Sequence, residues 1–338
     1  MGRKNEATKD GFKLKPASRD PSYTRVHGNY PAKKYKKGTP AVTRLSFEFQ
    51  GDSTQYIDLA QALSAINRKL YRQGCYYYVN RVEMYNNEDA FVDLHVLPDT
   101  WVTRAAYRRA LGIFNEQNDR AMANTGMVAG KYHDFKVYMS ERHFDTGTTP
   151  PVLYDINSNY DALASDDWTY SELVSADDDG DATQEADNFS LHMLGGHNGS
   201  TDNWDSIGLI KSYEDTRARL PDVSPSINNL GQLQADPLFN LFDYSSEEQV
   251  NDVLANLADD ADQPPYDLSE MVGNSPRNHQ HVGRLVSTDT VGRKDQIGGF
   301  CAPLGLIMVD PQQTSTAFRI VVELAEGTYN GVYAERIA

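Results

Sequence analysis

The chain has 338 residues, of which 39% are apolar and 10% aromatic. This content is too rich in core-forming side chains for a wholly disordered protein, and the length suits one large domain or two ordinary ones. The apolar runs are far too short for a membrane-spanning helix and the first thirty residues are basic and polar, so we expect no membrane anchor and no secretory signal. Two cysteines far apart in sequence exclude a disulfide framework and a cysteine zinc site.

Charge divides the chain into two parts. Residues 1–44 contain 12 basic and 3 acidic residues, a net charge of +9, which leaves −25 for the rest of a chain whose total is −16. A basic segment on an acidic body indicates an anionic partner that the body itself would repel.

Residues 1–40 are predicted to be a flexible basic arm, because they lack apolar periodicity and are interrupted by glycine and proline. Cations interleaved with aromatic rings suit the phosphates and unpaired bases of a single nucleic-acid strand. No rigid helix or ribbon is predicted that would read bases, so binding should be non-specific, with a log–log salt slope of roughly −6. The candidate nucleic-acid-binding residues are Arg3, Lys4, Lys9, Lys13, Lys15, Arg19, Arg25, Lys33, Lys34, Tyr35, Lys36 and Lys37.

The lysine-rich segment Lys33–Lys37 has two other interpretations. It fits a nuclear-import signal, which is compatible with nucleic-acid binding, and basic tails also serve merely as solubilising ends.

The body begins with alternation that predicts a strand with Leu45, Phe47 and Phe49 on one face. Asp58 is placed to cap a helix that runs to Leu70 and stops at Gly74. Residues 75–85 and 91–97 are rich in Tyr and Val or alternate in hydrophobicity, and residues 86–89 predict a turn that would join them as a hairpin.

A second helix is predicted from Thr100 or Asp99 to about Ala121, with Val102, Ala106, Ala110 and Ile113 on its apolar face. The other face carries Arg104, Arg108 and Arg109. These arginines are interpreted either as a solvated helix face or as the lining of an inner or intersubunit surface.

Further strands are predicted at 135–139, around 153, and at 168–174, 189–194, 281–286, 304–309 and 318–324. Pro311, Gln312 and Gln313 predict the turn between the last two, and residues 246–257 a helix. These eight to ten strands show no regular alternation with helices, which argues against a parallel sheet. We therefore predict an all-β fold: an eight-stranded antiparallel jelly-roll sandwich, residues 41–338, with helical insertions in its loops.

A search for chemistry finds no catalytic motif, so we expect no enzyme activity and no cofactor. The acidic cluster at 177–187 predicts a solvated loop; a calcium site is the alternative, although Ala186 stands where an EF-hand would need its bidentate glutamate. The pairs His279–His281 and His192–His197 lack a third ligand at a diagnostic spacing, and no metal site is predicted.

The organisation of a basic arm followed by a strand-rich body resembles the capsid proteins of small icosahedral viruses. Its ending, Gly327-Thr-Tyr-Asn-Gly-Val-Tyr-Ala-Glu-Arg336, is similar to those of circular, Rep-encoding single-stranded DNA (CRESS DNA) viruses. The resemblance implies a capsid protein that self-assembles into an icosahedral shell, with the arm inside on a single-stranded DNA genome and the acidic loops outside. It also implies location in the virion, and in the host nucleus during assembly.

Three alternatives remain at this point. The chain fits a nucleic-acid-binding accessory protein without a shell, and it fits the capsid protein of a small RNA virus, because ammonium–phosphate pairing hardly distinguishes DNA from RNA. A jelly-roll enzyme or glycan-binding module is the third, for which the sequence offers no catalytic set.

Overall fold

The structure is a computed structural model that describes residues 40–51, 53–155, 159–163, 167–175, 187–200, 203–216, 251, 266, 271–288, 293–313 and 317–337. Pro40–Ala338 group as one compact unit. Residues 1–39 of the predicted arm, residues 177–186 of the acidic cluster and, apart from Asn251, the predicted helix at 246–257 lie outside the described residues. Within these residues, no helix has the length and apolar content needed to cross a membrane.

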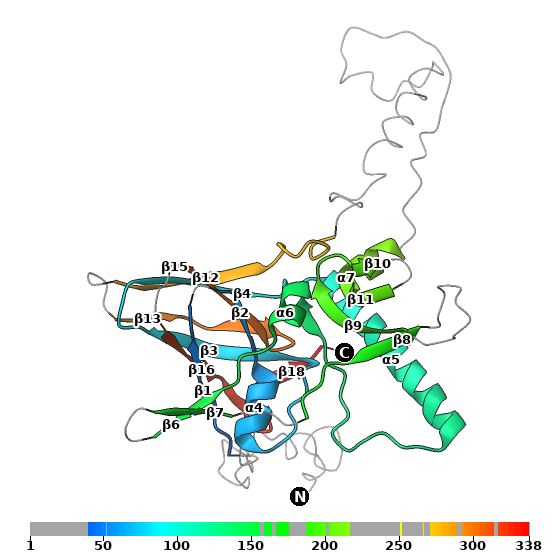
Figure 1. Ribbon diagram of the computed structural model, residues 1–338, viewed down its shortest axis with the longest axis horizontal. Helices are drawn as coiled ribbons and strands as arrows, with labels where there is room; N and C mark the ends of the chain where they lie inside the picture. Colours follow the sequence, from blue (N-terminus) through cyan, green and yellow to red (C-terminus); the bar gives the residue numbers. More distant parts are fainter. Residues whose placement is uncertain are drawn as a thin grey trace, which may run out of the picture. The chain divides into compact units, whose positions relative to one another are not determined.

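Two antiparallel sheets pack face to face (Figure 1). In the first sheet, six strands follow the order β13 (Lys294–Ile297), β3 (Cys75–Tyr85), β16 (Phe318–Leu324), β1 (Arg44–Phe49), β6 (Val152–Tyr154), β7 (Tyr160–Ala162). Two more strands, β14 (Phe300–Pro303) and β18 (Ala334–Arg336), pair with β3. The second follows the order β12 (Gln280–Ser287), β4 (Ala90–Val96), β15 (Leu306–Gln313), β2 (Gln55–Asp58). The expectation of a predominantly β, antiparallel architecture is confirmed.

A third sheet, which the sequence did not indicate, lies beside these two. It contains β10 (Asn198–Ser200), β11 (Asn203–Gly208), β9 (Asp187–Leu194) and β5 (Tyr138–Ser140), with β8 (Glu172–Ser175) on β9. β9 runs parallel to both β5 and β11. Of the expected strand at 135–139, only its last two positions fall in β5, although Phe135, Val137 and Met139 are all buried.

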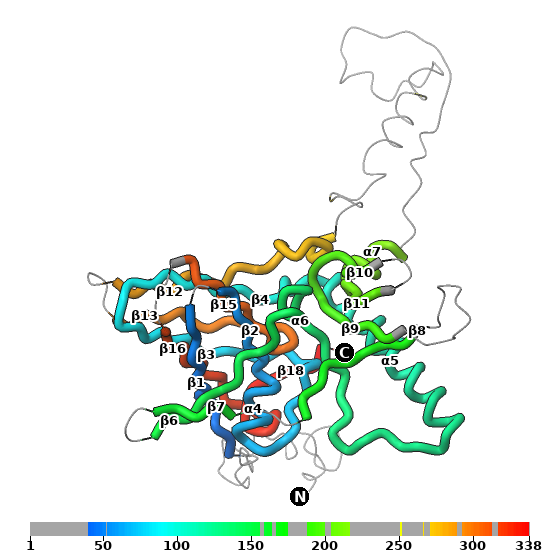
Figure 2. The backbone as a smooth tube through the Cα atoms, in the orientation of Figure 1, coloured from blue at the N-terminus to red at the C-terminus, as the bar shows by residue number. Residues whose placement is uncertain are grey.

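The main core fills the space between the first two sheets. Leu45, Phe47 and Phe49 are fully buried, as their alternation predicted, and the Phe49 ring stacks on Phe318 at a centroid distance of 5.3 Å. β1 pairs along its whole length with β16, so the first and last long strands lie side by side, blue beside red in Figure 2. Because these two strands come from opposite ends of the folded unit's sequence, the core is complete only when both ends are in place.

The helices form where the sequence supplies caps. Asp58 caps α4 (Leu59–Asn67) by accepting hydrogen bonds from the backbone N–H groups of Ala60 and Gln61, as predicted. The helix ends before Gly74, because Arg68 adopts a left-handed conformation with φ of 54°. Among the described residues, α5 (Trp101–Thr125), α6 (Glu141–Thr146) and α7 (Leu209–Asp215) are further helices, and β17 (Glu326–Tyr329) precedes β18.

α5 covers the second core cluster with the first half of its length. Thr100 caps it, and Val102, Ala106 and Ala110 are buried as predicted. Ile113 is 44% exposed, and Phe114 is buried instead. The predicted apolar face was therefore wrong at its last position, because α5 buries positions four residues apart, Ala106, Ala110 and Phe114.

The predicted hairpin of β3 and β4 is wrong. β3 pairs with β16, β13, β14 and β18, whereas β4 pairs with β12 and β15 in the other sheet. Both strands bury alternate residues in the same core, for example Met84 and Leu94. Hydrophobic alternation requires only that the strands share a core, and here they face each other across it.

The predicted turn at 311–313 is also wrong, because these residues belong to β15. Pro311 pairs with Val92, and the register shifts between Pro311 and Gln313. A proline lacks the N–H that a sheet needs, and such a bulge accommodates it.

Candidate nucleic-acid interface

The predicted nucleic-acid-binding residues, Arg3 to Lys37, lie outside the described residues. What the structure describes is the segment from which the arm departs, here called the arm root (residues 40–43). The backbone N–H of Val42 donates to Asn67 Oδ1 at 2.7 Å, and Asn67 Nδ2 donates to the Val42 carbonyl at 3.1 Å. Lys69 Nζ donates to the Pro40 carbonyl at 3.3 Å. The end of α4 therefore holds residues 40–43 against the folded unit.

The connector that follows α4 (residues 68–74) carries three cations, of which Lys69 contacts the arm root. Arg68 is exposed, and among the described residues it has no ion-pair partner. Lys69 is half-buried against the arm root. Together they extend the positive charge predicted for the arm onto the folded unit. The sequence analysis assigned these residues only to the end of a helix; their proximity to Pro40 depends on the tertiary contact through Asn67.

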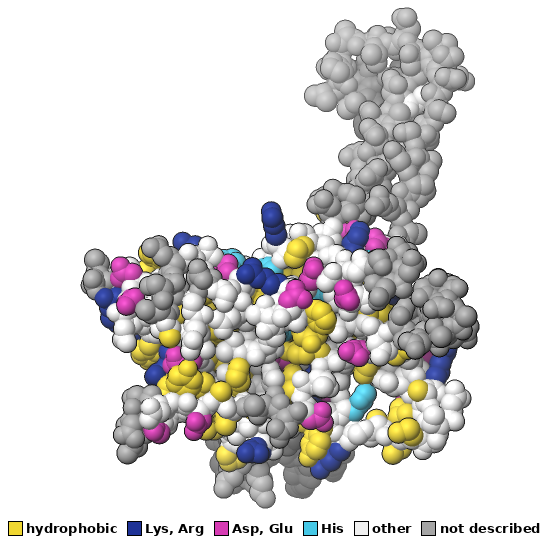
Figure 3. All heavy atoms as spheres, viewed as in Figure 1, with side chains coloured by type: hydrophobic (Ala, Val, Ile, Leu, Met, Phe, Trp, Pro, Cys, Tyr) yellow, Lys and Arg dark blue, Asp and Glu magenta, His cyan; other side chains and the backbone are white. Residues whose placement is uncertain are grey.

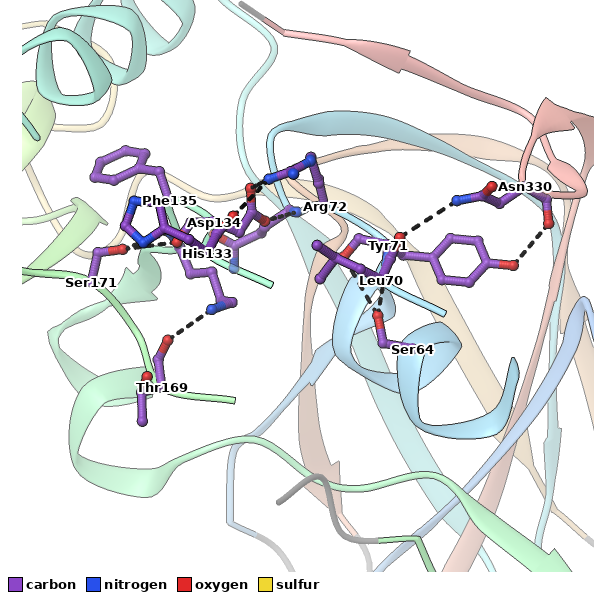
Figure 4. Close-up of polar contacts among 12 residues, drawn as sticks. Ser64, Leu70, Tyr71, Arg72, His133, Asp134, Phe135, Thr169, Ser171 and Asn330 are labelled. Carbon is purple, nitrogen blue, oxygen red and sulfur yellow. Dashed lines mark hydrogen bonds and ion pairs between the residues drawn. The ribbon is translucent and has the colours of Figure 1, made fainter. Parts of the chain in front are cut away.

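Arg72, the third cation, is neutralised by a neighbouring segment (Figure 4). Its guanidinium donates to Asp134 Oδ1 at 2.8 Å and to the His133 carbonyl at 2.9 Å. The other carboxylate oxygen of Asp134 accepts from the backbone N–H of Gln73 at 3.1 Å. Arg72 therefore anchors the connector to residues 133–134 and offers little charge to a ligand.

The connector is also held from its other side. The Tyr71 hydroxyl donates to the Asn330 carbonyl at 2.9 Å, and Asn330 Nδ2 donates to the Leu70 carbonyl at 3.4 Å (Figure 4). Ser64 Oγ accepts from the Tyr71 N–H at 2.9 Å. These contacts, made by three separate parts of the chain, give Arg68 and Lys69 a rigid base.

Several other cations of the folded unit are paired with carboxylates. On the outer face of the first sheet, Glu83 accepts hydrogen bonds from Arg44 at 2.5 Å and Lys294 at 2.9 Å, and its side chain is only 3% exposed. The hydrogen bond from Lys294 is the main reason that the pKa of Glu83 is lowered, to about 2. On the second sheet, Arg284 forms a bidentate pair with Asp93, with both distances at 2.7 Å, which lowers the pKa of Asp93. In each of these pairs a carboxylate neutralises the cation.

The three arginines predicted on the other face of α5, Arg104, Arg108 and Arg109, are likewise engaged. Arg108 Nε donates to the Ile337 carbonyl at 3.0 Å, and Arg109 donates to the Ser212 carbonyl and the Thr216 hydroxyl. Arg104 lies 3.8 Å from Asp99. Two of the three therefore tie α5 to the C-terminal segment and to α7.

A buried hydrogen-bonded chain connects α4 with α6. Asp58 Oδ2 accepts from the Tyr170 hydroxyl at 3.3 Å, Tyr170 lies 2.8 Å from Thr148 Oγ1, and Thr148 lies 2.9 Å from His143 Nε2. Burial raises the pKa of Asp58 to about 6 and lowers that of His143 to about 3. Because both groups are at most 1% exposed, they have a structural role and cannot meet a large substrate.

Neighbouring histidines occupy the edge of the second sheet. The His95 ring lies 5.1 Å from that of His281 and 6.0 Å from that of His279, and burial lowers the pKa of His279 to about 4. His192 instead contacts the Gly196 carbonyl at 2.8 Å and orders a loop. Across the described part of the chain, no three His, Cys, Asp or Glu side chains are arranged to hold a metal ion.

Comparisons with known proteins provide no relative. No family model, no curated protein and no solved structure matches the chain. Its function is therefore argued from the sequence and the fold.

Proposed function

We propose that the chain is a viral capsid protein that self-assembles into an icosahedral shell and packages a single-stranded DNA genome through its basic N-terminal arm. The observation that carries the proposal is the order in which eight strands pair. Taken along the chain, these strands are β1, β2, β3, β4, β12, β13 with β14, β15 and β16.

The first of these strands pairs with the eighth, the second with the seventh, the third with the sixth and the fourth with the fifth, all antiparallel. Two further antiparallel pairs, the third strand with the eighth and the fourth with the seventh, complete two four-stranded sheets. A long antiparallel ribbon rolled into two facing sheets is the jelly-roll arrangement, which viral capsid domains share with lectins and cupins. We infer that the sandwich is a jelly roll and that β6, β7, β18 and the third sheet are additions to it.

Charge favours a capsid protein over the other jelly-roll classes. A segment of net charge +9 precedes a body of net charge −25. In a closed shell, the basic segment would bind the enclosed nucleic acid, and the acidic body would form an outer surface that keeps the particle soluble. A lectin or cupin has no need for such a division. The exposed Arg68 and the neighbouring Lys69 at the arm root continue the positive charge onto the surface that would face the genome.

The nucleus is the proposed site of assembly, with Lys33–Lys37 as the import signal. A fluorescent fusion of the full chain should accumulate in nuclei of cultured cells. Replacing Lys33, Lys34, Lys36 and Lys37 with alanine should leave it in the cytoplasm; unchanged nuclear accumulation would remove the signal from the proposal.

The test of the capsid proposal compares the full chain with a variant that lacks residues 2–40. Electron microscopy of the purified full chain should show closed particles, and nuclease treatment should leave protected nucleic acid inside. The deletion variant should still form particles but contain far less nucleic acid. An accessory binder would form no particles at all and would lose its binding with the arm, and protected RNA in place of DNA would indicate an RNA virus.

A further inference from the structure

An apolar groove lies between α5, α7 and the third sheet. It has a volume of about 380 Å³, and its lining includes Ile113, Leu173, Phe189, Trp204, Ile207 and Tyr213. Arg109 lies at its edge, with its guanidinium bonded to Ser212 and Thr216. Apolar recesses open to solvent on small proteins commonly mark binding surfaces.

The far end of α5 carries an apolar projection, here called the α5 tip (residues 127–132). Met127 is 70% exposed, Val128 89% and Tyr132 63%. In Figure 3 hydrophobic side chains gather where α5 ends in Figure 1. Three large apolar side chains within six residues, all mostly exposed, are costly to leave in water at roughly 25 cal/mol per Å².

The α5 tip is held away from the groove of its own chain. Ile113 lines the groove, and the same helix continues without a break to Thr125. At 1.5 Å per residue, the helix places these two positions roughly 18 Å apart. The chain that returns from the tip is fixed as well, because the His133 ring stacks on Phe114 at 5.3 Å. Met127 and Val128, which follow the last turn of α5, therefore lie far from the groove of their own chain.

Charge is compatible with such a contact. Lys131 is the one charged residue of the α5 tip. At the groove, the Asp215 carboxylate is 49% exposed and lies 3.6 Å from Nε2 of the lining residue His197. Lys211 Nζ contacts both Asp215 and Glu214 at 2.9 Å, so these two carboxylates share a single lysine. Lys131 of a second copy would give them a second cation at the polar rim of an apolar contact.

We propose that the α5 tip of one copy inserts Met127 and Val128 into the groove of a second copy of the chain. The inference deepens the proposed self-assembly and identifies one of its contacts. Because the two surfaces differ, the contact is head-to-tail: every copy offers both a tip and a groove, and repetition closes a ring when the rotation permits it. Rings of this kind are the building units of closed shells.

The first experiment changes the tip and the groove separately in the full chain. Val128→Glu and Ile113→Glu place a charge on exposed positions of the tip and the groove, so each variant should melt within a few degrees of the unmodified chain. Each should reduce the assembled fraction at least tenfold in sedimentation. Ala121→Glu adds the same charge to an exposed position of α5 outside both surfaces, and should assemble normally. Normal assembly of both Val128→Glu and Ile113→Glu would overturn the inference.

The second experiment tests the contact directly, whether or not shells form. Val128→Cys and Ile113→Cys are made in separate chains, and mild oxidation of their mixture should yield a disulfide-linked dimer. Each variant alone, and the unmodified chain with Cys75 and Cys301, should yield none. If the full chain forms no particles but the mixture cross-links, the capsid proposal fails and the contact stands. If particles form and the mixture does not cross-link, the contact is wrong and the capsid proposal stands.

Discussion

The backbone N–H of Met139 donates a hydrogen bond to Nδ1 of the buried His143 at 3.0 Å. The neutral ring therefore carries its proton on Nε2, which faces Thr148 Oγ1 at 2.9 Å. Protonation of Nδ1 would break the bond from Met139 and bury a charge. Protonation of His143 therefore lowers the free energy of unfolding.

Acidification should destabilise the fold through His143. Its pKa is lowered to about 3 by burial, so between pH 6.5 and 3 the unfolded chain binds a proton that the folded chain does not. This contribution to stability is complete above pH 6.5, and about 2 kcal/mol of it should be lost by pH 5. Urea unfolding at pH 7.5, 6 and 5 measures it. His143→Gln should show a smaller loss across this range, and an identical loss in both proteins would contradict the assignment.

Asp58 should act in the opposite direction. Burial raises its pKa to about 6, so between pH 6 and 3.8 the folded chain binds more protons than the unfolded chain. Its contribution is complete below pH 3.8 and is lost as the pH rises to 6, a difference of roughly 3 kcal/mol. Asp58→Asn retains an oxygen for the α4 cap but cannot titrate. Its stability should therefore fall more steeply on acidification than that of the unmodified chain, and parallel pH profiles would refute this.

The core between the two sheets depends on the strand β1. Phe47→Ala removes a fully buried ring and should reduce the free energy of unfolding by about 3–5 kcal/mol. Ser46→Ala, on the opposite face of the same strand, should change it by less than about 0.5 kcal/mol. Chemical denaturation of both variants provides the comparison. Equal effects would mean that β1 is not packed as described.

Several local features of the fold were predicted correctly from the sequence, and contacts between distant segments were not. The alternation of Leu45, Phe47 and Phe49 and the cap at Asp58 are local patterns, and both were predicted correctly. The partner of a strand is not a local property, so the hairpin of β3 and β4 was predicted where the structure has two facing sheets. For the same reason the hydrogen-bonded chain from Asp58 to His143 was not foreseen, because it joins residues from three segments that are distant in sequence.

The candidate nucleic-acid interface shows the same limit. The cations of residues 1–40 were identified from composition, and their contacts remain a prediction because they lie outside the described residues. Arg68 and Lys69 were missed as members of this surface, since only the bonds of Asn67 with Val42 bring the arm root to them. The groove and the α5 tip were missed because Ile113 was assigned to the buried face.

Nucleic-acid affinity should depend on salt through the arm. Replacing Lys33, Lys34, Lys36 and Lys37 with alanine removes four charges and should change the log–log slope for single-stranded DNA from roughly −6 to roughly −3. Replacing Arg68 and Lys69 together should change it by about 1. Arg284→Ala removes a cation that is paired with Asp93 and should leave the slope unchanged. Fluorescence anisotropy at several salt concentrations measures all three, and a full-chain slope near zero would contradict the role of the arm.

The most direct test of the central claim is electron microscopy of the purified full chain, followed by nuclease digestion and extraction of what remains. We predict closed particles of uniform size that protect single-stranded DNA. Monodisperse monomers at every salt concentration and pH, with no protected nucleic acid, would contradict the claim.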